Sequence, residues 1–397
     1  MSRPNQFLSP EGDLQEYFVD EYWLIDQWVG DTLWTWGNNG VGQLGDNTTT
    51  NRSTPVTTLA GGTNWKQVGC GGNIHAAAIK TDGTLWTWGQ NLFGTLGDNT
   101  GTDRSTPVTT FAGGTNWKQV SCGTQYDMAI KTDGTLWTWG RNSYGQLGDN
   151  TTTNQTTPVT TFAGGTNWKQ VSSGDRHTAA IKTDGTLWTW GRNAYGQLGD
   201  NTGPDKRTPV TTFLGGTDWK QVSSGDRHTA AIKTDGTLWT WGRANNGQLG
   251  NNITTQNRST PITTFLGGTN WKQVACGGYF TAATKTDGTL WTWGSNSFGQ
   301  LGVNDTNQRC TPITTFAGGT NWKQVVCGGG FAAAIKTDGT LWTWGRNNTG
   351  QIGDNTTTNR STPVTAFSGG TNWKQVDCGY QHTAAITSGT DPTYFIS

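Results

Sequence analysis

Short runs of alternating apolar and polar residues recur along most of the chain, separated by turn signals. In one stretch Trp65-Lys-Gln-Val-Gly-Cys alternates, His75-Ala-Ala-Ala-Ile-Lys is small and apolar, and Leu85-Trp-Thr-Trp-Gly places two Trp side chains on one face. Thr106–Phe111 is a fourth run, whose Pro suits the outer edge of a sheet because an edge position needs no N–H. The pattern predicts four short strands, with an Asp82-Gly83 hairpin between the second and third.

This four-strand pattern repeats at a fixed interval. The hexapeptide Thr-Leu-Trp-Thr-Trp-Gly occurs seven times at intervals of 51 or 52 residues, beginning at Thr32, Thr84, Thr135, Thr186, Thr237, Thr289 and Thr340. A unit of this size buries too little apolar surface to fold alone, so each must pack on its neighbours. The 397 residues therefore predict one repeat array and not two or three separate domains.

The two ends of the repeat region complement each other. The last unit stops after His382-Thr-Ala-Ala-Ile, where a hexapeptide should follow, and the first begins at Asp31, without the two strands that should precede it. One composite blade would take two strands from each terminus, which removes the open edges of a linear stack. We expect an all-β, seven-bladed propeller of four-stranded blades over residues 31–390, with residues 1–30 as an extension and 391–397 as a tail.

Two motifs carry a resemblance to a known family. The run Gly-Thr-Leu-Trp-Thr-Trp-Gly-x-Asn-x-x-Gly-Gln-Leu-Gly, as at 134–148, and Val-x-Cys-Gly-x-x-His-Thr-Ala-Ala, as at 376–385, resemble the regulator of chromosome condensation repeat. The resemblance implies a seven-bladed propeller with staggered closure. The founding nuclear member is a guanine-nucleotide exchange factor that uses a wedge inserted in one blade. The regular spacing here leaves no room for a comparable insertion, so exchange activity is not expected.

Other members of the family suggest further functions. Plant ultraviolet photoreceptors carry Gly-Trp-Arg-His-Thr with a chromophoric Trp, whereas this chain has Asp175 and Asp226 at the matching positions. Photoreception is therefore not expected, and 21 of the 23 Trp residues are explained as repeated packing positions. Bacterial β-lactamase inhibitor proteins with a similar fold imply that a bare propeller can act as a protein-binding disc.

Residues 1–30 differ in composition from the repeats. They hold six acids against Arg3, a net charge of −5, while residues 31–397 hold 21 Asp, no Glu and 26 Lys or Arg, a net charge of +5. Ser9-Pro-Glu is typical of a helix start, although the aromatic runs that follow also suit strands. The aromatic side chains predict an anchor that docks either on the propeller or on another protein, comprising Tyr17, Phe18, Tyr22, Trp23 and Trp28.

Location and partner class follow in part from what the sequence lacks. No stretch approaches the roughly 20 apolar residues of a membrane helix, and the N-terminus lacks the pattern of a secretory signal, so a cytoplasmic or virion-associated protein is expected. The weak positive charge of the repeats does not predict a nucleic-acid partner. Five of the six Cys share one slot that holds Ser173 and Ser224 in other copies, which indicates small structural side chains and a reducing compartment, with neither metal nor cofactor.

Evidence for catalysis is weak. The four His residues occupy one repeat slot, which holds Tyr or Phe in the other three copies, so a chemical role for the imidazole is not required there. Asp175 with His177, and Asp226 with His228, would be acid–base pairs for a hydrolase, but no nucleophile accompanies them. The oxygen-rich loops, as at 45–51, would suit a hard cation or, without clustered carboxylates, ordinary solvated turns.

Two loops differ most among the copies, and both should lie on one face of the disc. One follows the first strand and the other follows Trp-Gly, and aromatic and charged side chains on such a face suit protein recognition, with neutral drift as the alternative. The candidate partner-binding residues are Tyr126, Asp127, Asp175, Arg176, His177, Asp226, Arg227, His228, Tyr279, Phe280, Phe331, Tyr380, Phe93, Arg141, Tyr144, Arg192, Tyr195, Arg243, Phe298 and Arg346.

The sequence thus predicts a non-enzymatic propeller that binds a protein partner or builds an assembly. A short anchor before a rigid repeat head suits a phage virion component or a surface appendage. The alternatives are a regulatory binding protein, such as a GTPase exchange factor or an enzyme inhibitor, and a hydrolase that uses the Asp–His pairs.

Overall fold

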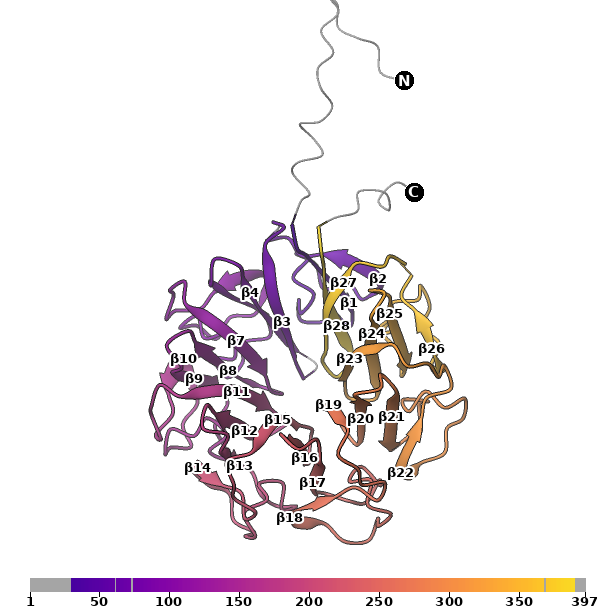
Figure 1. Ribbon diagram of the computed structural model, residues 1–397. Helices are drawn as coiled ribbons and strands as arrows, with labels where there is room; N and C mark the ends of the chain where they lie inside the picture. The colour runs from indigo at the N-terminus through magenta and orange to yellow at the C-terminus, as the bar shows by residue number, and fades with distance from the viewer. Residues whose placement is uncertain (1–29, 61, 73, 368, 390–397) are drawn as a thin grey trace, which may run out of the picture.

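The computed structural model describes residues 30–60, 62–72, 74–367 and 369–389, and within them 28 strands form seven four-stranded antiparallel sheets around a central axis (Figure 1). Blades 1 to 6 follow the chain in order, each from the inner to the outer strand. Blade 1 is β3 (Trp65–Gly71), β4 (His75–Lys80), β5 (Leu85–Gly89) and β6 (Arg104–Thr109); blade 2 is β7 (Trp117–Cys122), β8 (Tyr126–Lys131), β9 (Leu136–Gly140) and β10 (Gln155–Thr160); blade 3 is β11 (Trp168–Ser173), β12 (His177–Lys182), β13 (Leu187–Gly191) and β14 (Lys206–Thr211). Blade 4 is β15 (Trp219–Ser224), β16 (His228–Lys233), β17 (Leu238–Gly242) and β18 (Arg258–Thr263); blade 5 is β19 (Trp271–Cys276), β20 (Phe280–Lys285), β21 (Leu290–Gly294) and β22 (Arg309–Thr314); blade 6 is β23 (Trp322–Cys327), β24 (Phe331–Lys336), β25 (Leu341–Gly345) and β26 (Arg360–Thr365).

The closing blade joins the two ends of the repeat region, as the sequence predicts. Its strands are β27 (Trp373–Cys378), β28 (His382–Thr387), β1 (Thr32–Gly37) and β2 (Arg52–Thr57), in the sheet order β2-β1-β28-β27. β1 and β28 pair continuously from Thr32 with Thr387 to Gly37 with His382, and Figure 1 shows the two strands side by side. Because two strands come from each end, closure uses the same main-chain hydrogen bonds that hold every other blade together.

Three rings of hydrogen bonds join the blades, and each ring passes through all seven. In the inner ring, the Gln of Trp-Lys-Gln-Val donates to the Val carbonyl of the next blade at 3.0–3.2 Å, and Gln375 closes the circle on Val68. In the middle ring, the second Trp of the hexapeptide donates to a carbonyl of the preceding blade at 2.9–3.0 Å, with Trp36 bonded to Gln351 at the closure. These bonds explain why both residues are constant among the copies.

The outer ring depends on an unusual backbone conformation. The Asn of each Gly-Asp-Asn or equivalent loop has φ between 60° and 66°, and its N–H donates to the outer strand of the next blade at 2.9–3.0 Å, from Asn47 with Ser105 round to Asn355 with Ser53. Asn tolerates this left-handed region better than other side chains apart from Gly. Nearby, Gly199 has φ +69, and a Cβ there would lie 2.7 Å from Nε1 of Trp241. The loop residues are therefore selected by inter-blade contact.

The largest fully buried side chains are all tryptophans. In blade 1 the inner-strand Trp65 makes edge-to-face contacts with both hexapeptide residues, Trp86 at 6.5 Å and Trp88 at 6.4 Å, and Lys80 lies over Trp65 and Trp86. Trp65 and Trp88 are 1% and 0% exposed. Such contacts add to the burial of large apolar rings, so the hexapeptide is a packing and closure element, as expected.

Two details of the blade differ from or extend the sequence prediction. The fourth strand of blade 1 runs Arg104–Thr109, two residues before the predicted Thr106–Phe111, because its pairing with β5 begins at Arg104 opposite Gly89. Phe111 therefore lies beyond the strand and is 65% exposed. The predicted edge position of Pro107 is confirmed, since β6 ends the sheet. Within the described residues no helix is long and apolar enough to span a membrane.

Candidate functional site

The two variable loops of each blade meet on one face of the disc. The residue after Trp-Gly donates its N–H to a carbonyl of the loop between the first and second strands, as in Arg141 to Gln125 (2.8 Å), Arg192 to Arg176 (2.9 Å) and Arg243 to Arg227 (2.8 Å). We call the surface formed by these loops the variable face. The hydrogen bonds confirm that the connections after the first and third strands emerge together.

Arginine and aromatic side chains alternate across the variable face. Arg141 lies over Phe93 of the preceding blade at 5.1 Å, Arg192 over Tyr144 at 5.0 Å, and Arg346 over Phe298 at 5.1 Å. The contacts run from blade 1 to blade 6, and every Arg concerned is partly exposed. We call this set the Arg–aromatic belt; it consists of Phe93, Arg141, Tyr144, Arg176, Arg192, Tyr195, Arg227, Arg243, Tyr279, Phe298 and Arg346.

Several members of the belt are held in place by more than one contact. Arg176 lies over Tyr144 at 5.2 Å and donates to its hydroxyl at 2.9 Å, and Arg227 makes the same pair of contacts with Tyr195, at 5.2 and 3.1 Å. Arg243 lies between two rings, with its buried Nε lacking a hydrogen-bond partner among the described residues. Cation–π contacts at exposed sites contribute about 0.5–1 kcal/mol each, so the guanidinium groups are oriented before any partner arrives.

Seven of the predicted face residues are buried. Asp226 is 9% exposed, and the other six are 0% exposed and do not belong to the exposed surface: Tyr126, Asp127, His177, His228, Phe280 and Phe331. Five of these six occupy the slot that begins the second strand, where the ring packs over the Gly of Cys/Ser-Gly, and Asp127 is the next residue along β8. The Tyr126 hydroxyl reaches the next blade and donates to the His177 carbonyl at 2.5 Å. The prediction that these six side chains contact a partner is wrong, because both positions are buried between blades.

The proposed Asp–His pairs do not form. His177 Nε2 contacts the Thr229 hydroxyl of the next blade at 2.9 Å, and its Nδ1 has no partner among the described residues. His228 is placed in the same way against Thr281, also at 2.9 Å. Burial lowers the pKa of both imidazoles to about 3, so both stay neutral at neutral pH. Asp175 instead forms an ion pair with Arg176 at 3.3 Å, which removes the basis for the hydrolase interpretation.

Asp226 and Tyr380 meet at the mouth of the central channel on the variable face. They approach from blade 4 and from the closing blade, and the Tyr380 hydroxyl hydrogen-bonds the Asp226 carboxyl. Burial raises the pKa of Asp226 to about 7, although that hydrogen bond opposes the shift. Below the mouth, the channel encloses a cavity of about 330 Å³, lined by the seven Gln residues of the inner ring.

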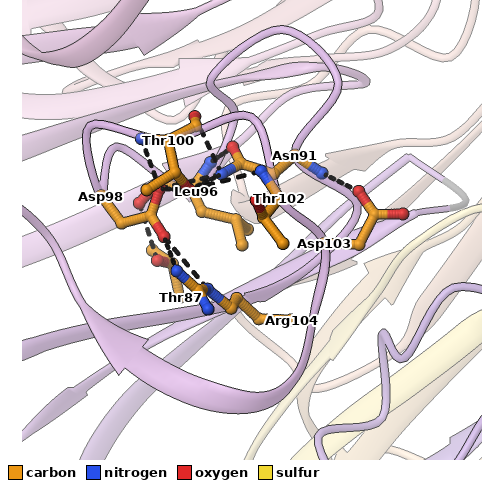
Figure 2. Close-up of polar contacts among 8 residues, drawn as sticks. All are labelled: Thr87, Asn91, Leu96, Asp98, Thr100, Thr102, Asp103 and Arg104. Carbon is orange, nitrogen blue, oxygen red and sulfur yellow. Dashed lines mark hydrogen bonds and ion pairs between the residues drawn. The ribbon is translucent and has the colours of Figure 1, made fainter.

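The oxygen-rich loops satisfy their own carboxylates. In Figure 2, Asn91 donates to Asp98 Oδ1 at 2.8 Å and to the Thr100 carbonyl at 3.1 Å, while Arg104 donates to Asp98 Oδ2 at 3.2 Å. Burial alone would raise the pKa of Asp98, but hydrogen bonds from Thr100, Asn91 and Arg104 outweigh it and hold the pKa below its usual value. The carboxylate is therefore engaged inside its loop, as expected for a turn and not for an open cation site.

Comparison with known proteins identifies the family to which this repeat architecture belongs. The sequence profile of the RCC1-like domain matches residues 153–394, more than half of the chain, and that of the regulator of chromosome condensation (RCC1) repeat matches residues 31–78 and 82–130. The chain belongs to the RCC1-like family. The Ultraviolet-B receptor UVR8 of Arabidopsis thaliana is 33% identical over 340 residues, which cover 84% of this chain and 77% of that protein.

Two further RCC1-like proteins show how widely the fold is shared. The E3 ubiquitin-protein ligase HERC2 of Homo sapiens is 28% identical over 374 residues, which are 91% of this chain but only 8% of that protein. The crystal structure of yeast RCC1 (Prp20), solved with Kap60, superposes with a TM-score of 0.80 at 18% identity and covers 93% of this chain and 92% of its own. That likeness shows the fold alone.

Two further sequence predictions and one missed signal remain to be compared with the structure. The predicted anchor residues Tyr17, Phe18, Tyr22, Trp23 and Trp28 lie outside the described residues. All six cysteines are free thiols, but Cys122 and Cys327 of the shared slot are partly exposed at the channel mouth and not fully buried. The sequence analysis did not propose His75 or Cys122 as functional residues. An available signal was Asp127, which stands where the other copies have Thr or Ala.

Proposed function

We propose that this chain is a non-catalytic, protein-binding propeller whose partner docks on the variable face. The observation that carries the proposal is the Arg–aromatic belt, which continues from blade 1 to blade 6 with its guanidinium groups partly exposed. Arg and Tyr are enriched among the residues that dominate binding energy at protein interfaces. Side chains oriented in advance lose less conformational entropy when a partner binds.

The charge of the belt favours an acidic partner segment. Six Arg residues line it, and the nearby acids offset little of that positive charge. Asp175 is already paired with Arg176, and the pKa of Asp226 is raised to about 7. A planar guanidinium can bind a carboxylate with two parallel hydrogen bonds. A segment rich in Asp or Glu with flat apolar side chains between them would match this alternation.

The relatives support binding more than they support any one activity. Yeast RCC1 (Prp20), which shares the fold, was solved with Kap60 bound to it, so a protein that contains this propeller can have a protein partner. UVR8 is named as an Ultraviolet-B receptor, but Asp175 and Asp226 stand here where the resemblance implies Trp, and photoreception is not part of the proposal. The uniform spacing of 51 or 52 residues likewise argues against the wedge of an exchange factor.

A matched pair of double variants tests the proposal. Arg192→Ala with Arg243→Ala removes two belt cations, and Lys118→Ala with Lys220→Ala removes the same charge from exposed positions at the start of the inner strands. The immobilised wild-type chain would be used to isolate a partner from extract of the source organism, and its affinity for each purified variant would then be measured. Loss of one or more interface hot spots, about 2 kcal/mol each, predicts binding at least ~30-fold weaker for the Arg pair alone.

The same experiment can contradict the proposal. Equal affinity of the two double variants, or greater weakening by the Lys pair, would place the partner elsewhere on the disc. Raising the salt concentration should also weaken wild-type binding more than binding of the Arg variant, because fewer charge pairs remain to be screened.

A finer form of the proposal concerns assembly. The six acids and six aromatic residues among residues 1–30 would anchor the disc to a larger particle, such as a virion or a surface appendage. Deleting residues 1–28 and measuring incorporation into that particle tests this anchor separately from the variable face. Unchanged incorporation would exclude it and leave the binding proposal intact.

A further inference from the structure

One inter-blade contact differs chemically from its equivalents. At the interface of blades 1 and 2, Cys122 of β7 pairs in register with Asp127 of β8, and His75 at the start of β4 reaches across from the neighbouring blade. His75 Nε2 lies 2.7 Å from Asp127 Oδ1, and both side chains are 0% exposed. One donor atom from each of the three residues, including Cys122 Sγ, lies within 4.8 Å of the other two.

A carboxylate such as that of Asp127 is not needed to complete this inter-blade contact. In blades 3 and 4 the same His position contacts a Thr hydroxyl of the next blade at 2.9 Å, so a neutral hydroxyl is sufficient to complete the contact. Asp127 takes the place of that Thr, yet its Oδ2, like His75 Nδ1, has no hydrogen-bond partner among the described residues. Leaving a buried polar atom unpaired is destabilising, and more so for a charged group.

We propose that His75, Cys122 and Asp127 bind one divalent transition-metal ion of the Zn²⁺ class. A thiolate, an imidazole and a carboxylate are the usual ligands of Zn²⁺, whereas Mg²⁺ and Ca²⁺ prefer several oxygen ligands. Tetrahedral Zn²⁺ with bonds of 2.0–2.3 Å holds its ligand atoms about 3.3–3.7 Å apart. The His75–Asp127 separation of 2.7 Å would widen by less than about 1 Å on binding, and the Cys122 thiol would release its proton.

Access to the site is through the channel mouth. Cys122 is partly exposed there, and Gly72, Gly123 and Thr124 also line the mouth. Three protein ligands leave a fourth position of the ion for water, on the side that opens to the mouth. The site lies at one inter-blade contact, so it is independent of the Arg–aromatic belt and of the proposed partner.

The repeat itself supplies conservative test variants. Cys122→Ser installs the residue found at Ser173 and Ser224, and Asp127→Thr installs the residue found at Thr178 and Thr229, so both replacements fit the fold elsewhere in the same chain. Cys276→Ser, at the equivalent slot of blade 5, and Cys310→Ser, the partly exposed cysteine outside the slot, serve as controls. Far-UV circular dichroism would confirm that every variant is folded.

Titration of the full-length, metal-free chain with Co²⁺ and with Zn²⁺ gives the readouts. The expected result is one equivalent bound, with a thiolate-to-cobalt charge-transfer band and displacement of cobalt by zinc. Cys122→Ser should abolish the band, and both site variants should bind at least ~10-fold more weakly, while both controls bind as the wild type does. No band at one equivalent, unchanged affinity in Asp127→Thr, or an equal loss in either control would overturn the proposal.

Discussion

The middle ring of hydrogen bonds offers a comparison in which two identical substitutions should differ in cost. Trp241 and Trp344 are both 0% exposed, and each donates from Nε1 to a carbonyl of the preceding blade at 2.9 Å. The Gln197 carbonyl that receives Trp241 also accepts from the Thr229 hydroxyl at 2.8 Å. The position of that Thr is taken by Ala332 in blade 6, so Trp344 is the only side-chain donor to the Gln300 carbonyl among the described residues.

Replacing each Trp by Phe separates packing from hydrogen bonding. Both variants lose the same part of an indole ring from a closed interior, at a cost of about 1–2 kcal/mol in the free energy of unfolding. Only Trp344→Phe leaves a buried carbonyl without a side-chain donor, which costs a further ~1–3 kcal/mol. Trp344→Phe should therefore be the more destabilised variant by about that amount.

Urea unfolding followed by far-UV circular dichroism measures the difference, with equal m-values required for the comparison. The double variant Trp344→Phe with Ala332→Thr restores a hydroxyl where blade 4 has Thr229, and it should recover part of the loss. Equal destabilisation of the two single variants within about 0.5 kcal/mol, or the reverse order, would refute the assignment of the cost to the unpaired carbonyl.

Three further predictions follow from single residues. The pKa of Asp226 is raised to about 7 in the folded state, so that state binds more protons than the unfolded chain between about pH 4 and pH 7, and stability falls as the pH rises through that window. The free energy of unfolding of Asp226→Asn should rise by up to a few kcal/mol relative to wild type between pH 5 and pH 8. Asp184→Asn is the control and should show no such gain, because Asp184 lies at an exposed turn where backbone and side-chain hydrogen bonds from Thr186 lower its carboxyl pKa. Parallel pH profiles for Asp226→Asn and wild type would contradict this prediction. Asn201 has φ 60°, so Asn201→Gly should change the melting temperature little and Asn201→Val should cost about 1–2 kcal/mol, with equal melting temperatures as the contrary result. Asp98→Ala removes the acceptor of three side chains in its loop and should cost more in urea unfolding than Asp103→Ala, which removes the acceptor of one backbone N–H; the reverse order would argue against the loop network.

The strands and their closure were predictable because their determinants are local and repeated. Asp-Gly marks each hairpin, the hexapeptide marks each third strand, and the missing strands at the two ends fix how the ring closes. The boundary of the fourth strand was misplaced by two residues, since it depends on pairing between Gly89 and Arg104 across the loop of residues 90–103. That pairing has no signal in the local pattern of apolar residues.

The candidate site was predictable only in part. Variation among copies selected loops that lie together on one face, but it does not distinguish exposed from buried positions. His177, Phe280 and Tyr126 are different residues in one slot, yet all three are buried between blades. Arg192 and Arg243 also belong to variable loops, but both are partly exposed.

By itself the sequence determined the architecture: the number of blades, the order of strands, the turn types and the face on which the variable loops emerge. These follow from short-range patterns that recur at one interval, so each copy confirms the others. Contacts between positions about 52 residues apart were decided only by the tertiary structure. Whether Arg192 lies over Tyr144, or His75 meets Asp127, depends on how adjacent sheets twist and pack, and side chains in register along the repeat become neighbours only when the ring closes.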